Sequence, residues 1–319
     1  MENRRTALIT GGSVYLGSHL SKALKADGWN VVIYDKVYPK HKYCDLYSCG
    51  DIRDRRELTV LFDKIKFDTV FHLAGRIEVG ESNLHPTEFC DVNVGGTATL
   101  LNIMNYWGVK NIVFSSTAGV YVPNNKPLNE NSEIAGNSVY ASTKIACENM
   151  IKDSGFNYII FRYFNLAGAD PKAEIGENHS PETHLIPRIL QNLNNVTING
   201  NDYSTPDGSC IRDYVHVCDV ADAHVKAAYH LLNKNGSQIL NLGTGQGHSI
   251  FEIIKLVEEI TKQKVEYTVL PRREGDGDCL IADASLAKSI LSFNPKYDIN
   301  EIIKTAYRWE KTRKTYDKV

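Results

Sequence analysis

The chain has 319 residues, of which 42% are apolar and 23% are charged, and its formal net charge is −2. This composition is typical of a globular protein with one large or two modest cores, and it gives no reason to expect nucleic acid as a partner. No apolar run approaches the ~20 residues of a membrane-spanning helix, so no membrane partner is expected either.

Through the first half of the chain, short β-branched runs alternate with segments of helical periodicity. Buried strands are predicted at 7–10, 31–34, 69–73, 112–115 and 158–161, with helices near 17–27, 54–65, 91–107 and 140–154. This alternation is typical of right-handed βαβ units. The predicted fold class is therefore α/β, with a doubly wound parallel Rossmann sheet.

The later part of the chain predicts a second, smaller unit. A helix at 217–232 and a strand at 238–242 indicate a return to the first sheet. The remaining helices are more broken and lie among most of the prolines, at 183–193, 249–262 and 299–313. We expect a cofactor-binding Rossmann domain over 1–170, to which 214–243 returns, and a smaller mixed α/β substrate-binding lobe over 171–319.

The segment TGGSVYLG at 10–17 joins the first strand to the first helix and resembles a dinucleotide fingerprint. Gly11 permits the tight turn, Gly17 permits close helix–strand packing, and the helix N-terminus attracts a pyrophosphate. Asp35 ends the second strand, where a carboxylate accepts ribose hydroxyls and repels a 2′-phosphate, which predicts NAD rather than NADP. Val14 departs from the pattern, because a glycine is usual there and a β-branched residue resists unusual φ angles. We expect weaker NAD binding or a shifted loop, and the alternative is an ordinary strand–helix turn that binds no nucleotide.

Other residues are expected to border the same cofactor. Asp51 and Ile52 follow a third short strand and are placed to frame the adenine, and Asn93 is placed to steady the loop after the fourth strand. The full set of further cofactor-binding candidates is Val14, Tyr15, Leu16, Asp51, Ile52, Leu73, Ala74, Gly75, Asn93, Ser115, Tyr140, Lys144 and Tyr163.

Tyr140 is followed four residues later by Lys144, and Thr117 lies at the end of the strand predicted at 112–115. Residues four apart share one face of a helix, so the ammonium would lie near the phenol and favour its ionised form. Tyrosine titrates near ~10, and a base at neutral pH needs a shift of roughly 3 units, which the lysine and a cationic nicotinamide ring would together supply. With the Thr117 hydroxyl added, the pattern predicts proton removal coupled to hydride transfer. A surface helix pair is the alternative for the Tyr/Lys spacing alone.

The seven cysteines are scattered along the chain and form neither a C-x-x-C pair nor a zinc-type spacing with histidine. We therefore expect reduced thiols, a cytoplasmic protein and no metal site.

Several longer motifs resemble one known family. They are FSSTAGVY at 114–121, Y-x-x-x-K at 140–144, RYFN at 162–165 with GA at 168–169, HLIP at 184–187, G-x-x-x-RDYVHV-x-D at 208–219 and PRREGD at 271–276. Nearly end to end, the chain resembles the extended short-chain dehydrogenase/reductases, and among them the nucleotide-sugar epimerases. The Tyr/Lys pair marks only the superfamily, whereas the last three motifs are more specific to such epimerases.

The resemblance implies a UDP-sugar substrate bound by the second lobe. Arg212 and Arg273 would clamp its pyrophosphate through bidentate contacts, with ordinary surface ion pairing as the alternative for each. His184 and Asn199 differ from the residues that relatives often carry at these positions. The other substrate-binding residues implied are Thr117, Asn165, His184, Leu185, Asn199, Tyr214 and Asp276.

The resemblance also implies a reaction. Tyr140 would remove the proton of the sugar 4′-hydroxyl with help from Thr117, a hydride would pass to NAD, and its return to the other face of a transient 4-keto sugar would invert C4 of a UDP-hexose such as UDP-glucose or UDP-galactose. Relatives are commonly homodimers that pair the helices corresponding to 91–107 and 140–154.

Alternatives to this reaction remain. A nucleotide-sugar 4,6-dehydratase is disfavoured, because Thr117 is followed by Ala118 and Gly119 rather than by the two acidic residues of those enzymes. An epimerase or decarboxylase for another UDP-sugar stays open, as does a non-catalytic NAD or nucleotide-sugar binding protein.

Overall fold

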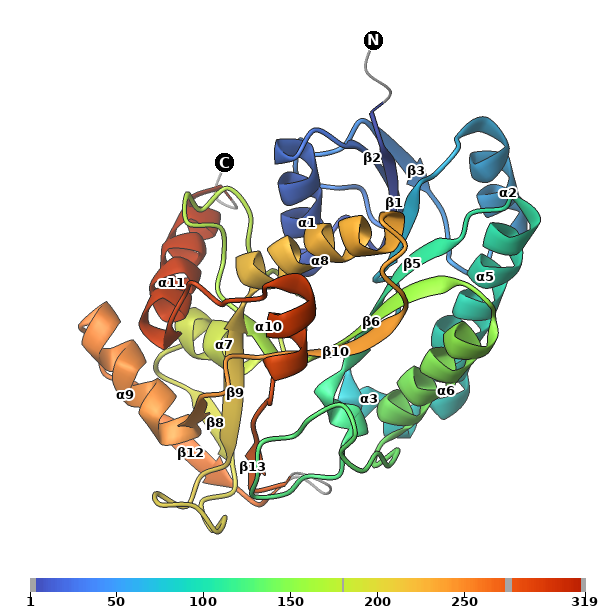
Figure 1. The fold of residues 1–319 in the computed structure, drawn as a ribbon. Coiled ribbons are helices and arrows are strands. Elements are labelled where there is room, and N and C mark those ends of the chain that lie inside the picture. The colour runs from blue at the N-terminus through green and yellow to red at the C-terminus, as the bar shows by residue number, and fades with distance from the viewer. Residues whose placement is uncertain (1–3, 180, 273–276, 317–319) are drawn as a thin grey trace. The chain divides into compact units, whose positions relative to one another are not determined.

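The computed structural model describes residues 4–179, 181–272 and 277–316 (Figure 1). The chain folds into two compact units. Unit 1 comprises Met1–Val120, Ile134–Arg162 and Ala221–Leu240, and unit 2 comprises Tyr121–Glu133, Tyr163–Val220 and Asn241–Val319. That the first region binds the cofactor and the second the sugar nucleotide stays a prediction.

A seven-stranded sheet in the order β10-β6-β5-β4-β1-β2-β3 forms the centre of unit 1 within the described residues. The strands are β1 Thr6–Thr10, β2 Asn30–Asp35, β3 Leu46–Cys49, β4 Thr69–His72, β5 Asn111–Thr117, β6 Asn157–Tyr163 and β10 Gln238–Leu242. The pairings β1–β2, β1–β4, β2–β3 and β4–β5 are parallel. The predicted α/β class with a doubly wound parallel sheet is thus confirmed. The strand order reverses between β1 and β4, where such sheets bind ligands at their carboxyl edge.

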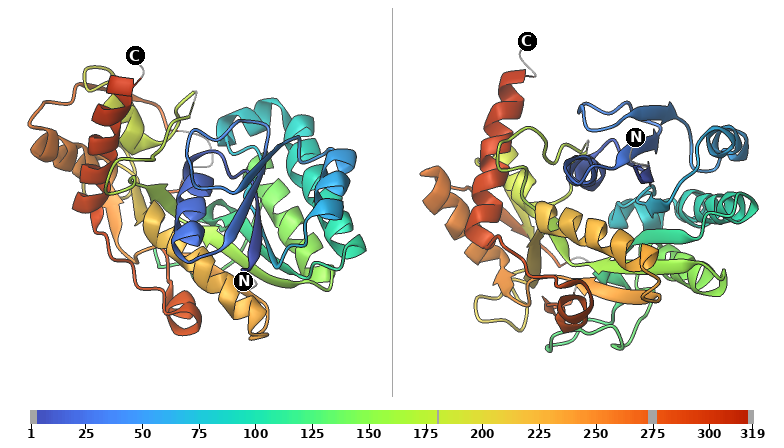
Figure 2. Two further views of the ribbon diagram at one scale, coloured as in Figure 1. Left: turned by 90° about the horizontal axis from the view of Figure 1, so that it is seen from above. Right: turned by 45° about the horizontal axis from the view of Figure 1, so that its top comes forward.

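Helices cover both faces of this sheet (Figure 2). Helices α2 Arg55–Lys64, α5 Gly96–Tyr106 and α6 Val139–Asp153 lie on one face, and α1 Tyr15–Ala26 and α8 Val217–Leu232 lie on the other. Successive side chains of a strand point to opposite faces. Val70 of β4 therefore joins the core under α2, α5 and α6, while Phe71 packs against His224 of α8. Burial on both faces is why these strands are nearly continuous apolar runs in the sequence.

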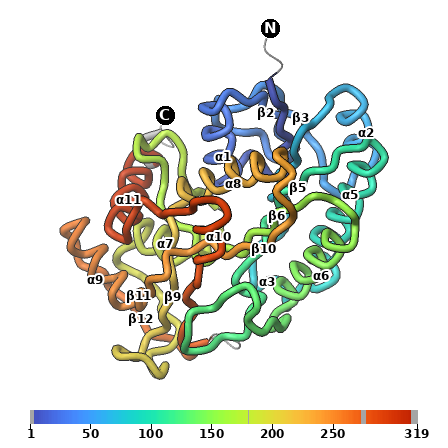
Figure 3. The backbone as a smooth tube through the Cα atoms, in the orientation of Figure 1, coloured from blue at the N-terminus to red at the C-terminus, as the bar shows by residue number. Residues whose placement is uncertain are grey.

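The helix predicted at 91–107 is wrong in its first part. Instead of one α-helix, the chain forms α3 Val79–Leu84, α4 Pro86–Phe89 and a π-helical segment Cys90–Gly95 before α5 begins at Gly96, a path that Figure 3 traces from α3 to α5. A π turn inserts an extra residue into the helical repeat without a periodic sequence signal, and such turns are frequent at functional sites. Asn93 lies in this π segment.

Unit 2 is assembled from short elements. Strands β7 Asn165–Ala167, β9 Ile211–His216, β11 Gly247–Ser249 and β13 Cys279–Leu280 form one sheet, and β8 Val196–Asn199 pairs with β12 Tyr267–Leu270. Its helices are α7 Leu185–Gln191, α9 Ile250–Thr261, α10 Ser285–Leu291 and α11 Ile299–Tyr316. Apolar side chains of α7, β8, α9 and α11 form one core, for example Ile189, Ile198, Val257 and Ile302. None of the helices in the described part of the chain combines the length and apolar character needed to cross a bilayer.

Candidate active site

The turn between β1 and α1 brings the backbone of the chain unusually close to itself. Gly11 has φ +74°, and a Cβ atom there would lie 2.7 Å from the backbone nitrogen of Ala74. A Cβ on Gly17 would lie 2.4 Å from the carbonyl oxygen of Gly11. Only glycine fits at both positions, and a close backbone turn that leads into a helix N-terminus is suited to a pyrophosphate.

Val14 does not strain this turn. It is the N-cap of α1, with φ −110° and ψ −167°, an extended conformation that a β-branched residue adopts readily. Its carbonyl accepts the first helical hydrogen bond from the Ser18 N–H at 2.7 Å, and its side chain is 44% exposed. The expectation that valine would meet an unfavourable φ angle here is therefore wrong.

Asp35 at the end of β2 braces the same turn. Its carboxylate accepts hydrogen bonds from the backbone N–H of Ser13 at 3.0 Å and of Val37 at 3.1 Å. The negative charge is thereby held beside the β1–α1 turn, where the sequence predicts the adenosine ribose.

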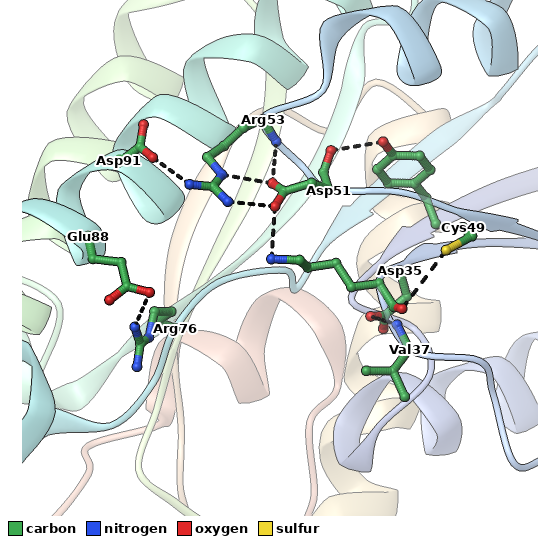
Figure 4. Close-up of polar contacts among 10 residues, drawn as sticks. Asp35, Val37, Cys49, Asp51, Arg53, Arg76, Glu88 and Asp91 are labelled. Carbon is green, nitrogen blue, oxygen red and sulfur yellow. Dashed lines mark hydrogen bonds and ion pairs between the residues drawn. The ribbon is translucent and has the colours of Figure 1, made fainter.

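An ionic cluster follows β3 and is drawn in Figure 4. Asp51 accepts from both Nε and Nη2 of Arg53, at 2.9 and 2.7 Å, and lies 2.8 Å from Nζ of Lys36. Arg53 also reaches Asp91 at 2.5 Å. The hydrogen bonds from Arg53 outweigh burial and hold the pKa of Asp51 well below its usual range. The Lys36 side chain remains 64% exposed while it pairs with Asp51.

Asn93 fixes the loop that follows β4. Its Oδ1 accepts the Arg76 N–H at 2.8 Å, and its Nδ2 donates to the Arg76 carbonyl at 3.2 Å and to Thr143 Oγ1 at 3.0 Å. The amide thus links the loop containing Leu73, Ala74 and Gly75 to α6. Arg76 also pairs with Glu88 at 2.5 Å (Figure 4).

The structure brings Thr117, Tyr140 and Lys144 together at the end of β5 and the start of α6. The Tyr140 phenol is hydrogen-bonded to the side chain of Thr117. Lys144 Nζ donates to the Ser115 carbonyl at 2.8 Å and lies 5.8 Å from the centroid of the Tyr140 ring. Only 3% of Lys144 is exposed, so a charged or proton-shuttling amine is held in a dry position beside the phenol.

Burial dominates the acidity of both groups. It raises the pKa of Tyr140 to about 12, although the hydrogen bond from Thr117 opposes this shift, and it lowers the pKa of Lys144 to about 8. The protein side chains by themselves therefore do not make the phenol acidic, and the expectation that Lys144 and a cationic nicotinamide ring together lower the pKa of Tyr140 stays a prediction.

A buried ion pair joins α6 to β6, and it was not predicted from the sequence. Glu148, one turn after Lys144, accepts from Arg162 Nη2 at 2.6 Å and from Ser116 Oγ at 2.5 Å. Glu148 and Arg162 are 1% and 3% exposed in their side chains. The sequence does show that Glu148 follows Lys144 by four residues, a spacing that places both side chains on one face of the same helix.

In unit 2, the residues expected to bind substrate have different environments. Arg212 donates through Nη1 to the carbonyls of Ile211 at 2.9 Å and Gly277 at 3.0 Å. Asn165 of β7 is in register with Tyr214 of β9, whose ring is 5% exposed and belongs to the core. Tyr163 is nearly buried at the end of β6, and Asn199 ends β8. Arg273 and Asp276 lie outside the described residues.

His184 and Leu185 mark the start of α7. His184 is the N-cap, and its Nδ1 is hydrogen-bonded to Glu177 Oε1. Burial disfavours the charged imidazole, but this hydrogen bond and the carboxylate charges raise the pKa of His184. His179 and Glu182 complete a cluster of four side chains that the sequence analysis did not single out.

Comparison with known proteins places this geometry in a family. Residues 7–243 match the model of the NAD dependent epimerase/dehydratase family. The chain belongs to this family. The match runs from the second residue of β1 to just past the end of β10, so it includes Thr117, Tyr140 and Lys144.

Individual members of the epimerase/dehydratase family are similar over almost the whole chain. A UDP-glucose 4-epimerase from Halalkalibacterium halodurans is 42% identical over 317 residues, covering 95% of each chain. The crystal structure of UDP-glucose 4-epimerase from Stenotrophomonas maltophila with bound NAD and formylated UDP-arabinopyranose has a TM-score of 0.93 at 35% identity and covers 98% of this chain and 100% of that one. The corresponding enzyme from Brucella ovis in complex with NAD has a TM-score of 0.91 at 38% identity, with coverage of 96% and 98%.

Proposed function

We propose that this protein inverts C4 of a UDP-hexose, interconverting UDP-glucose and UDP-galactose with NAD as its cofactor. The observation that carries the proposal is the meeting of Thr117, Tyr140 and Lys144 at the carboxyl edge of the sheet. The glycine cradle of the β1–α1 turn fits the pyrophosphate of NAD, and relatives of this length and similarity are UDP-glucose 4-epimerases, two of them solved with NAD.

The protein side chains divide the proton chemistry between them. When bound, NAD supplies a hydride acceptor at C4 and, in its oxidised form, a positive ring charge. Tyr140 removes and later returns the proton of the 4′-hydroxyl, and Thr117 orients both oxygens through its hydroxyl. Because burial raises the pKa of Tyr140 to about 12, the phenol becomes a base only when positive charge lies close to it. Lys144 contributes such a charge while it is protonated.

We assign the remaining predicted residues as follows. Gly11, Val14, Tyr15, Leu16, Gly17, Asp35, Asp51, Ile52, Leu73, Ala74, Gly75, Asn93, Ser115 and Tyr163 contact NAD, and Asn165, His184, Leu185, Asn199, Arg212, Tyr214, Arg273 and Asp276 contact the UDP-sugar. The backbone cradle, the Asp35 brace and the Asn93 anchor support the first group. The second group rests on the motifs alone. We further propose a homodimer paired through α5 and α6, which rests on the family resemblance. A cytoplasmic location is proposed from the scattered cysteines.

Two related reactions deserve comparison. Dehydration needs an acid and a base next to Thr117, and Ala118 and Gly119 supply neither. Inversion of another UDP-sugar keeps the same chemistry, and a solved relative holds formylated UDP-arabinopyranose. The choice between hexose and pentose depends on the sugar pocket rather than on the catalytic side chains.

A direct assay tests the proposal. Purified protein is supplied with UDP-galactose, the reaction is stopped by heating, and the UDP-glucose that formed is then measured with UDP-glucose dehydrogenase and NAD⁺ in a separate second step. We expect turnover without added NAD if the cofactor is retained, and NAD in the supernatant of denatured protein. Absence of both turnover and NAD uptake would overturn the proposal, whereas NAD binding without turnover on UDP-hexoses, followed by turnover on UDP-pentoses, would move it to another sugar.

A further inference from the structure

The loop that leads into α7 carries two histidines and two glutamates within eight residues, in the pattern E-x-H-x-x-E-x-H at 177–184. One ligand atom from each of Glu177, His179, Glu182 and His184 lies within 4.8 Å of the others. This cluster is made within unit 2 and uses neither Tyr140 nor Lys144; of its members, only His184 is also among the residues proposed to contact the UDP-sugar.

Three pairs of donor atoms are spaced much as they would be around a small cation, whereas His184 Nδ1 and Glu177 Oε1 are closer because they are hydrogen-bonded to each other. His179 Nδ1 lies 3.2 Å from Glu177 Oε1 and 3.8 Å from Glu182 Oε2, and His184 Nδ1 lies 3.7 Å from Glu182 Oε1. A tetrahedral zinc ion with bonds of ~2.0–2.2 Å places its ligand atoms roughly 3.3–3.6 Å apart. If His184 Nδ1 and Glu177 Oε1 exchange their hydrogen bond for metal bonds and move apart, rotations of the side chains would bring all four donors onto one ion.

One carboxylate oxygen of the cluster, Glu182 Oε2, has an ion-pair contact with His179 Nδ1 but no hydrogen bond within the described residues. Glu182 Oε1 accepts the backbone N–H groups of Thr183 and His184 at 2.8 and 2.9 Å. Its Oε2 is buried and accepts no hydrogen bond from any residue in the described ranges, although the side chain is only 5% exposed. A buried carboxylate oxygen without a hydrogen bond is costly, and a metal ion would satisfy it.

Two side chains of α11 donate hydrogen bonds to the first part of this loop. The Glu177 carbonyl accepts from Trp309 Nε1 at 2.8 Å, and Asn178 Oδ1 accepts from Arg313 Nη1 at 3.1 Å. These contacts fix the backbone at the first ligand, so little conformational entropy is left to lose when the remaining ligands close on an ion.

We propose that Glu177, His179, Glu182 and His184 form a binding site for one divalent transition-metal ion, of which Zn²⁺ is the best match. Two imidazoles favour zinc and its neighbours over Mg²⁺ or Ca²⁺, and two carboxylates balance its charge. Four protein ligands leave no open position, which is typical of a structural rather than a catalytic zinc. The ion would fix the loop at the start of α7. The expectation of no metal site, drawn from the cysteines, is replaced by this proposal.

Metal titration of the whole, untagged chain tests the site. After removal of metals with a chelator and exchange into chelator-free buffer, Zn²⁺ is titrated by calorimetry and Co²⁺ by visible absorption. We expect one ion per chain, with the intense Co²⁺ bands of tetrahedral coordination. His179→Ala and Glu182→Gln should each weaken binding at least about tenfold, by loss of a ligand. His248→Ala is the matched control, because His248 and Glu252 form a pair at the same 3.8 Å separation outside the cluster.

Two results would overturn the site. Absence of stoichiometric Zn²⁺ and Co²⁺ uptake by the parent protein would show that protonated imidazoles and carboxylates form only an ion-pair network. Uptake that the two ligand variants and the control share equally would show adventitious binding. Circular dichroism verifies folding, and Glu182→Gln, which preserves side-chain shape, remains informative if His179→Ala does not fold. None of these readouts uses epimerase activity, so the outcome is independent of the proposed function.

Discussion

Tyr140 is a phenol that its own protein makes less acidic, since burial raises its pKa to about 12. If it is nevertheless the base, removing its oxygen should abolish proton transfer but leave the nucleotide contacts proposed for unit 2 intact. We expect Tyr140→Phe to lower kcat by roughly 10²–10⁴-fold, the usual worth of a general base. UDP affinity, measured by calorimetry, should change less than about twofold. A variant that turns over as fast as the parent would remove Tyr140 from this role.

Lys144 gives the reaction a predicted pH dependence. Burial lowers its pKa to about 8, so the ammonium that supports Tyr140 is present below that pH and is lost above it. Turnover should therefore fall as the pH rises through about 8, measured as kcat from about pH 6.5 to about 9.5. Lys144→Arg keeps the charge and should lose this falling limb, whereas Lys144→Met should be slow throughout. An unchanged limb in Lys144→Arg would assign it to another group.

Val14 offers a test of the dinucleotide turn. Its extended backbone suits valine, and its partly exposed side chain lies at the N-cap, beside the amides expected to receive the pyrophosphate. Val14→Gly should remove this bulk and bind NAD several-fold more tightly, while changing the free energy of unfolding by only about a few tenths of a kcal/mol. Calorimetric titration of NAD and urea unfolding measure the two effects. Weaker NAD binding in the variant would show that the valine side chain contributes to the contact.

At the scale of elements, prediction from sequence succeeded where burial imposes a pattern. Strands β1, β2 and β4 are apolar runs because both of their faces are covered, and α6 shows helical spacing from Tyr140 to Lys144. The short strands of unit 2, such as β13 with two residues, are held by their neighbours and have no periodicity of their own. The π segment before α5 could not be predicted for the same reason. It contains Asn93, whose amide holds the loop after β4.

Helix α6 depends on the buried pair between Glu148 and Arg162, which ties it to β6 and, through Ser116, to β5. Glu148→Ala leaves a buried guanidinium without its partner, so we expect the free energy of unfolding to fall by about 3–5 kcal/mol. The exposed pair of Glu301 and Lys304 provides the matched control, and Glu301→Ala should leave stability nearly unchanged. Urea unfolding measures both variants, and equal losses would contradict the importance assigned to burial.

Across the whole molecule, the alternation of strands and helices was enough to predict a doubly wound parallel sheet, whereas the reversal of strand order between β1 and β4 came from the structure. The candidate catalytic residues were predicted from that topology and from motif spacing, because strand ends of a parallel sheet meet at one edge. The cluster at Glu177 and His179 could not be foreseen in the same way, because its closeness depends on a loop conformation that α11 stabilises. The pKa of Tyr140 was also out of reach, since it is set by burial that only the folded chain reveals.

The preference for NAD over NADP should be measurable as a difference in the Tm of the whole protein. A ligand that binds only the folded state stabilises it by about 2.7 kcal/mol at a hundred times its Kd, so Tm reports affinity. Because the Asp35 carboxylate is fixed beside the β1–α1 turn, we expect NAD to raise Tm in differential scanning fluorimetry and NADP to raise it far less. Asp35→Asn retains an acceptor for the Ser13 and Val37 N–H groups but loses the charge, so the difference between the two cofactors should narrow. Equal shifts with NAD and NADP in the parent protein would contradict the assignment of Asp35 to the ribose.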